Sequence, residues 1–171
     1  MKKLFVTIII FCSITVSGFA QKFAMVDMEY IMKNIPSYES TTEQLNLVSR
    51  QWRSEIEQKM QEVQKLYKDY QTELIFLSED QKASREEEII QKEKETQELK
   101  RNYFGPEGEL FKKRESLMKP IQDEIFNAIQ EISREQNLDL VLDRTSAVSV
   151  IYSTPKIDIS DAVLKKLGYS N

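Results

Sequence analysis

The sequence predicts a mostly helical α+β protein, in which a long helical hairpin, similar to a coiled coil, protrudes from a small body containing β-strands. Residues 37–104 contain neither Gly nor Pro. Through the first half of this segment apolar side chains recur at steps of three and four, which is the period of an α-helix. A charged segment of this length is too polar to be buried in a small domain. Short apolar runs typical of strands stand near both ends of the chain.

Composition restricts the chemistry that the chain can perform. The 171 residues suffice for one modest domain, 30% of them are charged, and His is absent. The single cysteine, Cys12, lies in a segment that we expect to be removed. Metal sites of His or Cys and Ser-His or Cys-His nucleophiles are thereby excluded from the mature chain. We therefore expect no catalytic residues, no metal and no cofactor, and a protein that is not an enzyme.

Residues 1–20 have the organisation of a secretory signal peptide. Lys2 and Lys3 precede a short apolar run, Leu4 to Val16, and small residues at Gly18 and Ala20 favour cleavage before Gln21. The alternative is a membrane anchor, but the run is shorter than the roughly 20 residues that span a bilayer. We expect an exported protein. Cleavage changes the formal net charge from −4 to −6, which favours neither nucleic acid nor anionic lipid as a partner.

Residues 21–36 are expected to belong to the body. The run Phe23–Val26 predicts a strand, and Asp27 is placed to cap a short helix over Met28–Lys33. Pro36 then breaks the helix, and Ser37 is expected to cap the long helix that follows.

Residues 37–104 are predicted to form the hairpin, with its tip near Ser78. Ser78 and Gln81 match a capping box, which predicts the start of a second helix. The alternative is one uninterrupted helix, since no Gly or Pro enforces a turn. The descending segment, Glu79 to Arg101, has 14 charged residues in 23, so it can pack only along a narrow seam. Trp52 is expected in the core at the base of the arm.

Residues 105–136 are predicted to return to the body as a kinked helix. Gly105, Pro106 and Gly108 interrupt the helical pattern and form either a hinge or a kink imposed by packing. Pro120 is expected either to kink the returning helix or to occupy its first turn. Beyond it an apolar stripe predicts burial: Ile121, Ile125, Ile129 and Ile132.

Residues 137–171 are predicted to form a β-hairpin and a last helix. The strands are Leu138–Leu142 and Val148–Tyr152, joined by a turn over Arg144–Ala147. The helix Asp161–Leu167 ends at Gly168, where a glycine cap belongs. Because an isolated two-stranded hairpin is marginally stable, we expect it to pair with Phe23–Val26 and with other subunits.

Together these features resemble a known family. The likeness covers residues 21–168. Its most specific parts are two sequences: L-D-L-V-L-D, within Asn137–Asp143, and D-I-S-D-A-V-L-K-K-L, within Ile157–Leu167. They are similar to the Skp/OmpH family of periplasmic chaperones. The resemblance implies a homotrimer with a barrel-like β body and three helical arms around a cavity. It also implies binding of unfolded outer-membrane proteins without ATP.

The chain departs from that family's best-known enterobacterial member, which is strongly basic. The acidic charge of this chain argues against binding of anionic lipid or lipopolysaccharide. The alternative function is that of a structural or adaptor coiled-coil protein of the cell envelope. A protein that is only a spacer needs only the heptad repeats of a coiled coil. The C-terminal region, which combines predicted strands with a helix, therefore favours the chaperone interpretation.

Candidate client contacts lie along the arm. Leu74 to Leu77 are four consecutive apolar residues, which point to all sides of a helix, so one seam cannot cover them. We expect Ile75 and Phe76 to contact clients or a neighbouring arm, although they could instead close the tip of the hairpin. Met and aromatic side chains also suit adaptable contacts, with seam packing as the alternative: Met60, Tyr67, Tyr70, Tyr103 and Phe104.

Overall fold

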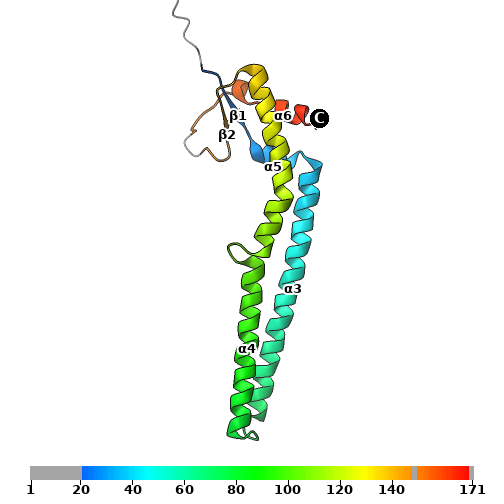
Figure 1. Cartoon of the computed structure of the whole chain (residues 1–171), viewed down its shortest axis with the longest axis vertical. Helices are drawn as coiled ribbons and strands as arrows, with labels where there is room; N and C mark the ends of the chain where they lie inside the picture. The colour runs from blue at the N-terminus through cyan, green and yellow to red at the C-terminus, as the bar shows by residue number, and fades with distance from the viewer. Residues whose placement is uncertain (1–20, 148–149, 170–171) are drawn as a thin grey trace, which may run out of the picture. The chain divides into compact units, whose positions relative to one another are not determined.

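The computed structural model describes residues 21–147 and 150–169, so the predicted signal peptide over residues 1–20 lies outside the described part. The chain divides into two units. The described residues up to Tyr30 and from Asn127 onwards form the body unit, and Ile31–Phe126 form the arm unit. Figure 1 labels most of the elements of both units. The predicted class, a mostly helical α+β fold with a long helical hairpin, is confirmed.

The body unit contains a two-stranded parallel sheet. Strand β1, Phe23–Val26, pairs with β2, Leu140–Asp143, in a register that aligns Phe23 with Leu140 and Val26 with Asp143. The first strand is where the sequence predicts it, and the second begins two residues later than expected. Pairing of β2 with β1 is also confirmed. Three β1 residues are buried, which makes this strand the centre of the body: Ala24, Met25 and Val26.

The predicted β-hairpin is not formed by the described residues. Val150 to Tyr152 have no strand structure, and Val148 and Ser149 lie outside the described part. A strand needs a hydrogen-bonded neighbour, and β2 takes β1 rather than this segment as its partner. Ile151 is fully exposed and Tyr152 is 79% exposed. The turn after β2 is confirmed, with the Ala147 N–H donating to the Asp143 carbonyl at 2.9 Å.

The chain also forms three short helical elements, the first of which begins in the body unit and ends in the arm unit. Helix α2 spans Met28–Lys33 as predicted, and the Asp27 carboxylate accepts the Tyr30 N–H at 2.8 Å. A 3₁₀ turn, η1, spans Pro155–Ile157, and α6 spans Ser160–Lys166. Gly168 follows α6 with φ of 85°, the left-handed conformation that favours glycine after a helix.

The arm unit is dominated by two long helices that lie side by side (Figure 1). Helix α3 spans Pro36–Glu73 and α4 spans Glu79–Phe104, so the chain turns back near Ser78 and the alternative of one uninterrupted helix is wrong. Both halves of the predicted capping box are present. At about 1.5 Å per residue, the 38 residues of α3 extend roughly 57 Å.

The start of α3 differs from the sequence prediction. Ile35 is the N-cap residue, it makes no side-chain cap, and Pro36 occupies the first turn. The prediction that Ser37 caps this helix is therefore wrong. Proline suits the first helical turn because its φ angle is already helical and its missing N–H has no acceptor there.

Helix α5, Glu109–Gln136, contains Pro120 in its interior, so the alternative of a first-turn proline is wrong. Three residues of the predicted stripe are buried, Ile121, Ile125 and Ile132, whereas Ile129 is half-buried and Ala128 takes the buried position next to it. Phe126 stands beside this stripe and is 61% exposed, so the apolar surface of α5 is wider than its covered part.

Candidate functional site

The seam between α3 and α4 is incomplete. Ile56 and Ile89 are buried, but α4 presents few large apolar residues, and Thr96 takes a buried position instead. A groove of 370 Å³ remains between the helices, with Ile56, Met60 and Val63 on the α3 side and Glu93, Thr96, Gln97 and Lys100 on the α4 side. Met60 thus lines an open groove and is half exposed.

An aromatic cluster occupies the seam where α4 ends. The Trp52 and Tyr103 rings stack at 4.6 Å between centroids, and Phe104 meets both edge-on at 6.4 Å. The Tyr103 hydroxyl donates to the Glu55 carboxylate at 2.9 Å, which raises the pKa of this phenol. Trp52 therefore packs midway along α3 rather than at the base of the arm. The structure brings Tyr103 and Phe104 together in the seam, as the alternative interpretation of these residues anticipated.

The two remaining tyrosines lie on the outer part of the hairpin. Tyr67 is half exposed. The Tyr70 hydroxyl donates a short hydrogen bond to Glu86 across the two helices, and this bond raises the pKa of Tyr70 to about 12. Tyr70 therefore joins α3 to α4 near the turn, while Tyr67 offers free aromatic surface.

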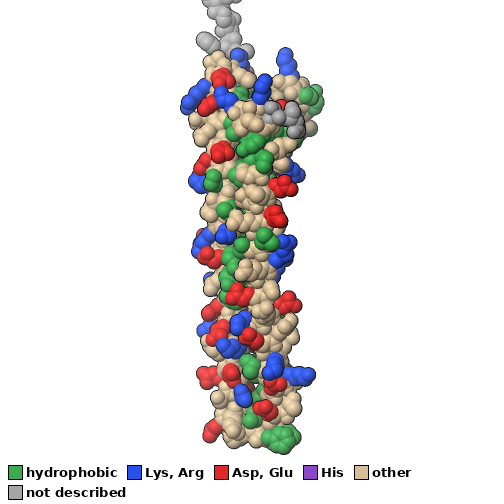
Figure 2. Space-filling view, turned by 90° about the vertical axis from the view of Figure 1, so that its right-hand side faces the viewer, with side chains coloured by type: hydrophobic (Ala, Val, Ile, Leu, Met, Phe, Trp, Pro, Cys, Tyr) green, Lys and Arg blue, Asp and Glu red, His purple; other side chains and the backbone are tan. Residues whose placement is uncertain are grey.

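The turn between α3 and α4 carries the most exposed apolar side chains of the hairpin. We call Leu74, Ile75 and Phe76 the tip patch; they are 38%, 82% and 81% exposed. The Phe76 N–H donates to the Glu73 carbonyl at 2.8 Å, so the chain leaves the helix just where the apolar run begins. Figure 2 shows hydrophobic side chains at this end of the hairpin, at the bottom of the view, and mixed charges along its length.

The loop between α4 and α5 contains the three residues predicted as a hinge: Gly105, Pro106 and Gly108. The φ angle of Gly105 is −66°, which any residue can adopt. The constraint is one of space, because a Cβ on Gly105 would lie 2.4 Å from the Arg101 carbonyl oxygen. A Cβ on Gly108 would lie 2.8 Å from the carbonyl oxygens of Asn102 and Tyr103. The glycines therefore allow the loop to fold tightly onto the end of α4.

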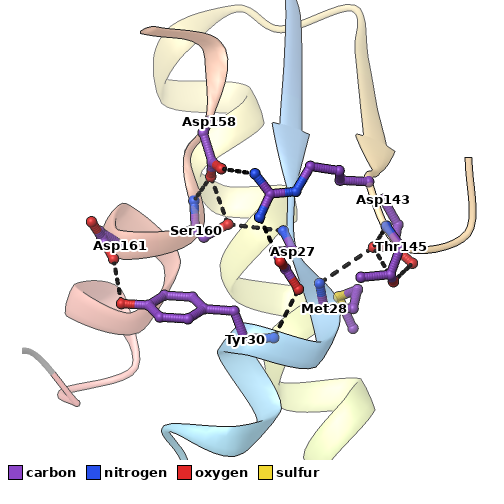
Figure 3. Close-up of polar contacts among 9 residues, drawn as sticks. Asp27, Met28, Tyr30, Asp143, Thr145, Asp158, Ser160 and Asp161 are labelled. Carbon is purple, nitrogen blue, oxygen red and sulfur yellow. Dashed lines mark hydrogen bonds and ion pairs between the residues drawn. The ribbon is translucent and has the colours of Figure 1, made fainter. Parts of the chain in front are cut away.

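The body contains a polar network that the sequence pattern does not predict. Arg144 forms ion pairs with Asp27 at 2.6 Å and Asp158 at 3.5 Å (Figure 3). The Ser160 hydroxyl accepts the Asp27 N–H at 2.8 Å and donates to Asp158 at 2.6 Å. We call these residues, with Asp143, the Arg144 network.

The Arg144 network ties together segments that are far apart in sequence. Asp143 accepts the Met28 N–H at 3.3 Å, and the Tyr30 hydroxyl donates to Asp161 at 3.0 Å. The network thus links the ends of β1 and β2 to the start of α6. The L-D-L-V-L-D and D-I-S-D sequences that carry the family resemblance supply most of its side chains. The repeated Asp residues in these two motifs are the sequence signal that points to the Arg144 network.

Among the described residues there is neither a candidate metal site nor a candidate membrane-spanning helix. No group of three or more acidic, His or Cys side chains is placed to hold a metal ion in this part of the chain. Among the helices of residues 21–147 and 150–169, none is long and apolar enough to cross a membrane.

Comparisons with known proteins agree with this architecture. No curated protein matches the chain. Among solved structures, it is similar to an OmpH-like protein of Caulobacter crescentus that is described as a candidate outer membrane chaperone. The TM-score is 0.68 and the identity 16%, over 86% of this chain and 83% of that one. At this identity the likeness shows a shared fold.

A family model described as outer membrane protein (OmpH-like) matches residues 22–167 of the 171. The match includes β1, the helical hairpin and the segments that contribute to the Arg144 network. The chain therefore belongs to the OmpH-like family.

Proposed function

We propose that this protein is a periplasmic holdase chaperone that binds unfolded outer-membrane proteins without ATP. One observation carries the proposal: a long charged hairpin ends in the tip patch, whose Ile75 and Phe76 are more than 80% exposed. Membership of the OmpH-like family and the fold shared with the Caulobacter crescentus protein support it.

The surface of the hairpin suits weak, distributed binding. The tip patch, Tyr67 and the groove beside Met60 offer separate apolar contacts, so an unfolded chain can engage several of them at once. Charged side chains between these contacts keep the hairpin itself soluble. Ion pairs such as Lys59–Glu62 and Lys92–Glu95 are exposed, so they contribute little to stability.

We further propose that three copies assemble so that their arms surround a client. One hairpin cannot enclose an unfolded chain, whereas three hairpins can form the walls of a cavity. In this proposal the body units form the trimer, and Gly105, Pro106 and Gly108 act as a hinge that adjusts the spread of the arms.

The test is suppression of aggregation. An unfolded β-barrel protein is diluted from urea with and without the mature chain, residues 21–171, and light scattering is followed. The proposal predicts reduced scattering in the absence of ATP. No reduction at a several-fold excess of the chain would refute the chaperone function and favour the adaptor alternative.

A pair of matched variants tests the proposed contacts. Ile75→Ser with Phe76→Ser should weaken client protection severalfold, because it removes the most exposed apolar surface of the hairpin. Leu47→Ser with Ile90→Ser removes exposed apolar side chains elsewhere on α3 and α4 and is the control. Equal loss in both variants would show that the tip patch has no special role.

A further inference from the structure

The tip patch lies in acidic surroundings. From Tyr70 to Gln81 the only charged residues are acidic: Glu73, Glu79 and Asp80. Between residues 70 and 88 there are six acidic and two basic side chains, a net charge of −4. Residues 100–119 have six basic and three acidic side chains, a net charge of +3. The acidity is therefore a local property of the tip and does not follow from the overall charge.

The two basic side chains near the tip are already engaged. Lys82 pairs with Glu79 at 2.7 Å. Arg85 pairs with Glu88 at 3.1 Å and approaches Glu73 at 3.8 Å. These cations lie beyond the turn on α4, and none lies in the stretch that contains Ile75 and Phe76. Lys82 and Arg85 thus partly neutralise Glu79 and Glu73, but residues 70–88 keep a net charge of −4, so a partner's cation approaching the patch is still attracted.

The end of α3 adds to the negative potential at the tip. Its last turn carries Glu73 and no basic residue, although a helix C-terminus exposes carbonyl oxygens that favour Lys or Arg. The start of α4 has the opposite polarity, but Glu79 and Asp80 occupy its first turn. The exposed apolar side chains are thus bordered by groups that attract positive charge.

We infer that the tip patch docks a cationic, apolar segment of an unfolded polypeptide, in which Lys or Arg alternates with large apolar side chains. This inference rests on the proposed function in one respect: it takes the bound segment to be part of a client protein. Apolar side chains of the segment cover Ile75 and Phe76, and its cations approach Glu73, Glu79 and Asp80. Acidic segments and anionic lipid surfaces are repelled from the same site.

The test uses two labelled peptides that differ only in charge. One alternates Lys with Leu and Phe, and the other has Glu in place of every Lys. Fluorescence anisotropy with the mature chain should show binding of the Lys peptide only, and raising the salt to about 1 M should weaken it by screening. Equal binding of both peptides would overturn the inference.

Variants separate the tip from the rest of the acidic surface. Glu79→Gln with Asp80→Asn should weaken binding of the Lys peptide about three- to fivefold, since two exposed charges are lost. Glu57→Gln with Glu98→Gln changes the net charge equally on exposed parts of α3 and α4 and should leave binding unchanged. Circular dichroism establishes that each variant retains its helices. Equal weakening by both variants would contradict a specific role of the tip.

Two further measurements distinguish the alternatives. Binding to vesicles of phosphatidylcholine and phosphatidylglycerol that depends on Ile75 and Phe76 would show a membrane surface as the occupant and overturn the inference. Client protection in the aggregation assay together with loss of peptide selectivity would refute the inference alone. Peptide selectivity without client protection would refute the proposed function and leave the charge preference of the tip in place.

Discussion

At the scale of single residues, Ser78 determines where the hairpin turns. Its side chain accepts the Gln81 N–H at 3.4 Å, and Gln81 accepts the Ser78 N–H at 2.9 Å. Ser78→Ala should lower the free energy of unfolding of the arm by about 1 kcal/mol, because the Gln81 N–H in the first turn of α4 loses its side-chain acceptor. Urea denaturation followed by circular dichroism measures the change. Ser84→Ala, on the exposed surface of α4, is the control and should be neutral or slightly stabilising.

Asp27 makes the stability of the body depend on pH in the acidic range. The Tyr30 N–H and the Arg144 guanidinium both donate to its carboxylate and hold the pKa of Asp27 below its ordinary value. The ionised form is therefore favoured in the folded state. Its contribution to stability is complete above the unfolded pKa of about 4 and is lost as the pH falls through the lower folded pKa.

Asp27→Asn isolates this charge, since Asn can still accept the Tyr30 N–H as a cap. The variant should be less stable than the wild type by about 1 kcal/mol at pH 7, and the difference should shrink towards pH 2. Urea denaturation at several pH values provides the comparison. A difference that stays constant with pH would show that the ionised state of Asp27 contributes nothing.

At the scale of elements, the loop between α4 and α5 depends on its glycines for space. Gly108→Ala should destabilise the arm by about 1–3 kcal/mol, because the new methyl group would meet two carbonyl oxygens at 2.8 Å. Thermal unfolding followed by circular dichroism tests this. Glu107→Ala changes the exposed residue next to it and should have little effect. If Gly108→Ala were equally harmless, the loop would have to be looser than its close contacts imply.

The elements that sequence reasoning located are those whose signals are local. The capping box at Ser78 and the apolar run of β1 involve neighbouring residues, and both were predicted in place. The β-hairpin was not, because the partner of β2 is β1, which lies more than a hundred residues earlier in the chain. The Arg144 network escaped for the same reason, since Asp27 and Asp158 meet only after folding.

The candidate site was predictable in part. Four consecutive apolar residues must leave some side chains uncovered, and Ile75 and Phe76 are indeed exposed. The engagement of Tyr103 in a stack with Trp52 depends on the register of α3 against α4, which no local pattern specifies. The groove beside Met60 likewise arises from Thr96 and Gln97 on the opposite helix.

At the scale of the whole molecule, the proposed function depends on how many arms act together. The segment Val150–Tyr152 has exposed apolar side chains and no strand partner among the described residues. A sheet edge in another copy would supply the missing hydrogen bonds and cover both side chains. We therefore predict that residues 21–171 form a trimer in solution, with a mass that sedimentation velocity measures directly.

Ile151→Ser with Tyr152→Ser should shift this trimer towards monomer, because each apolar side chain buried at an interface contributes about 1.5–3 kcal/mol. Client protection should fall with it, since a single hairpin encloses nothing. Ile75→Ser with Phe76→Ser removes two side chains of the arm that are also highly exposed and should leave the mass unchanged. A wild-type monomer that still protects its client would show that the arm binds by its own surface, and the tip patch would then carry the function without a cavity.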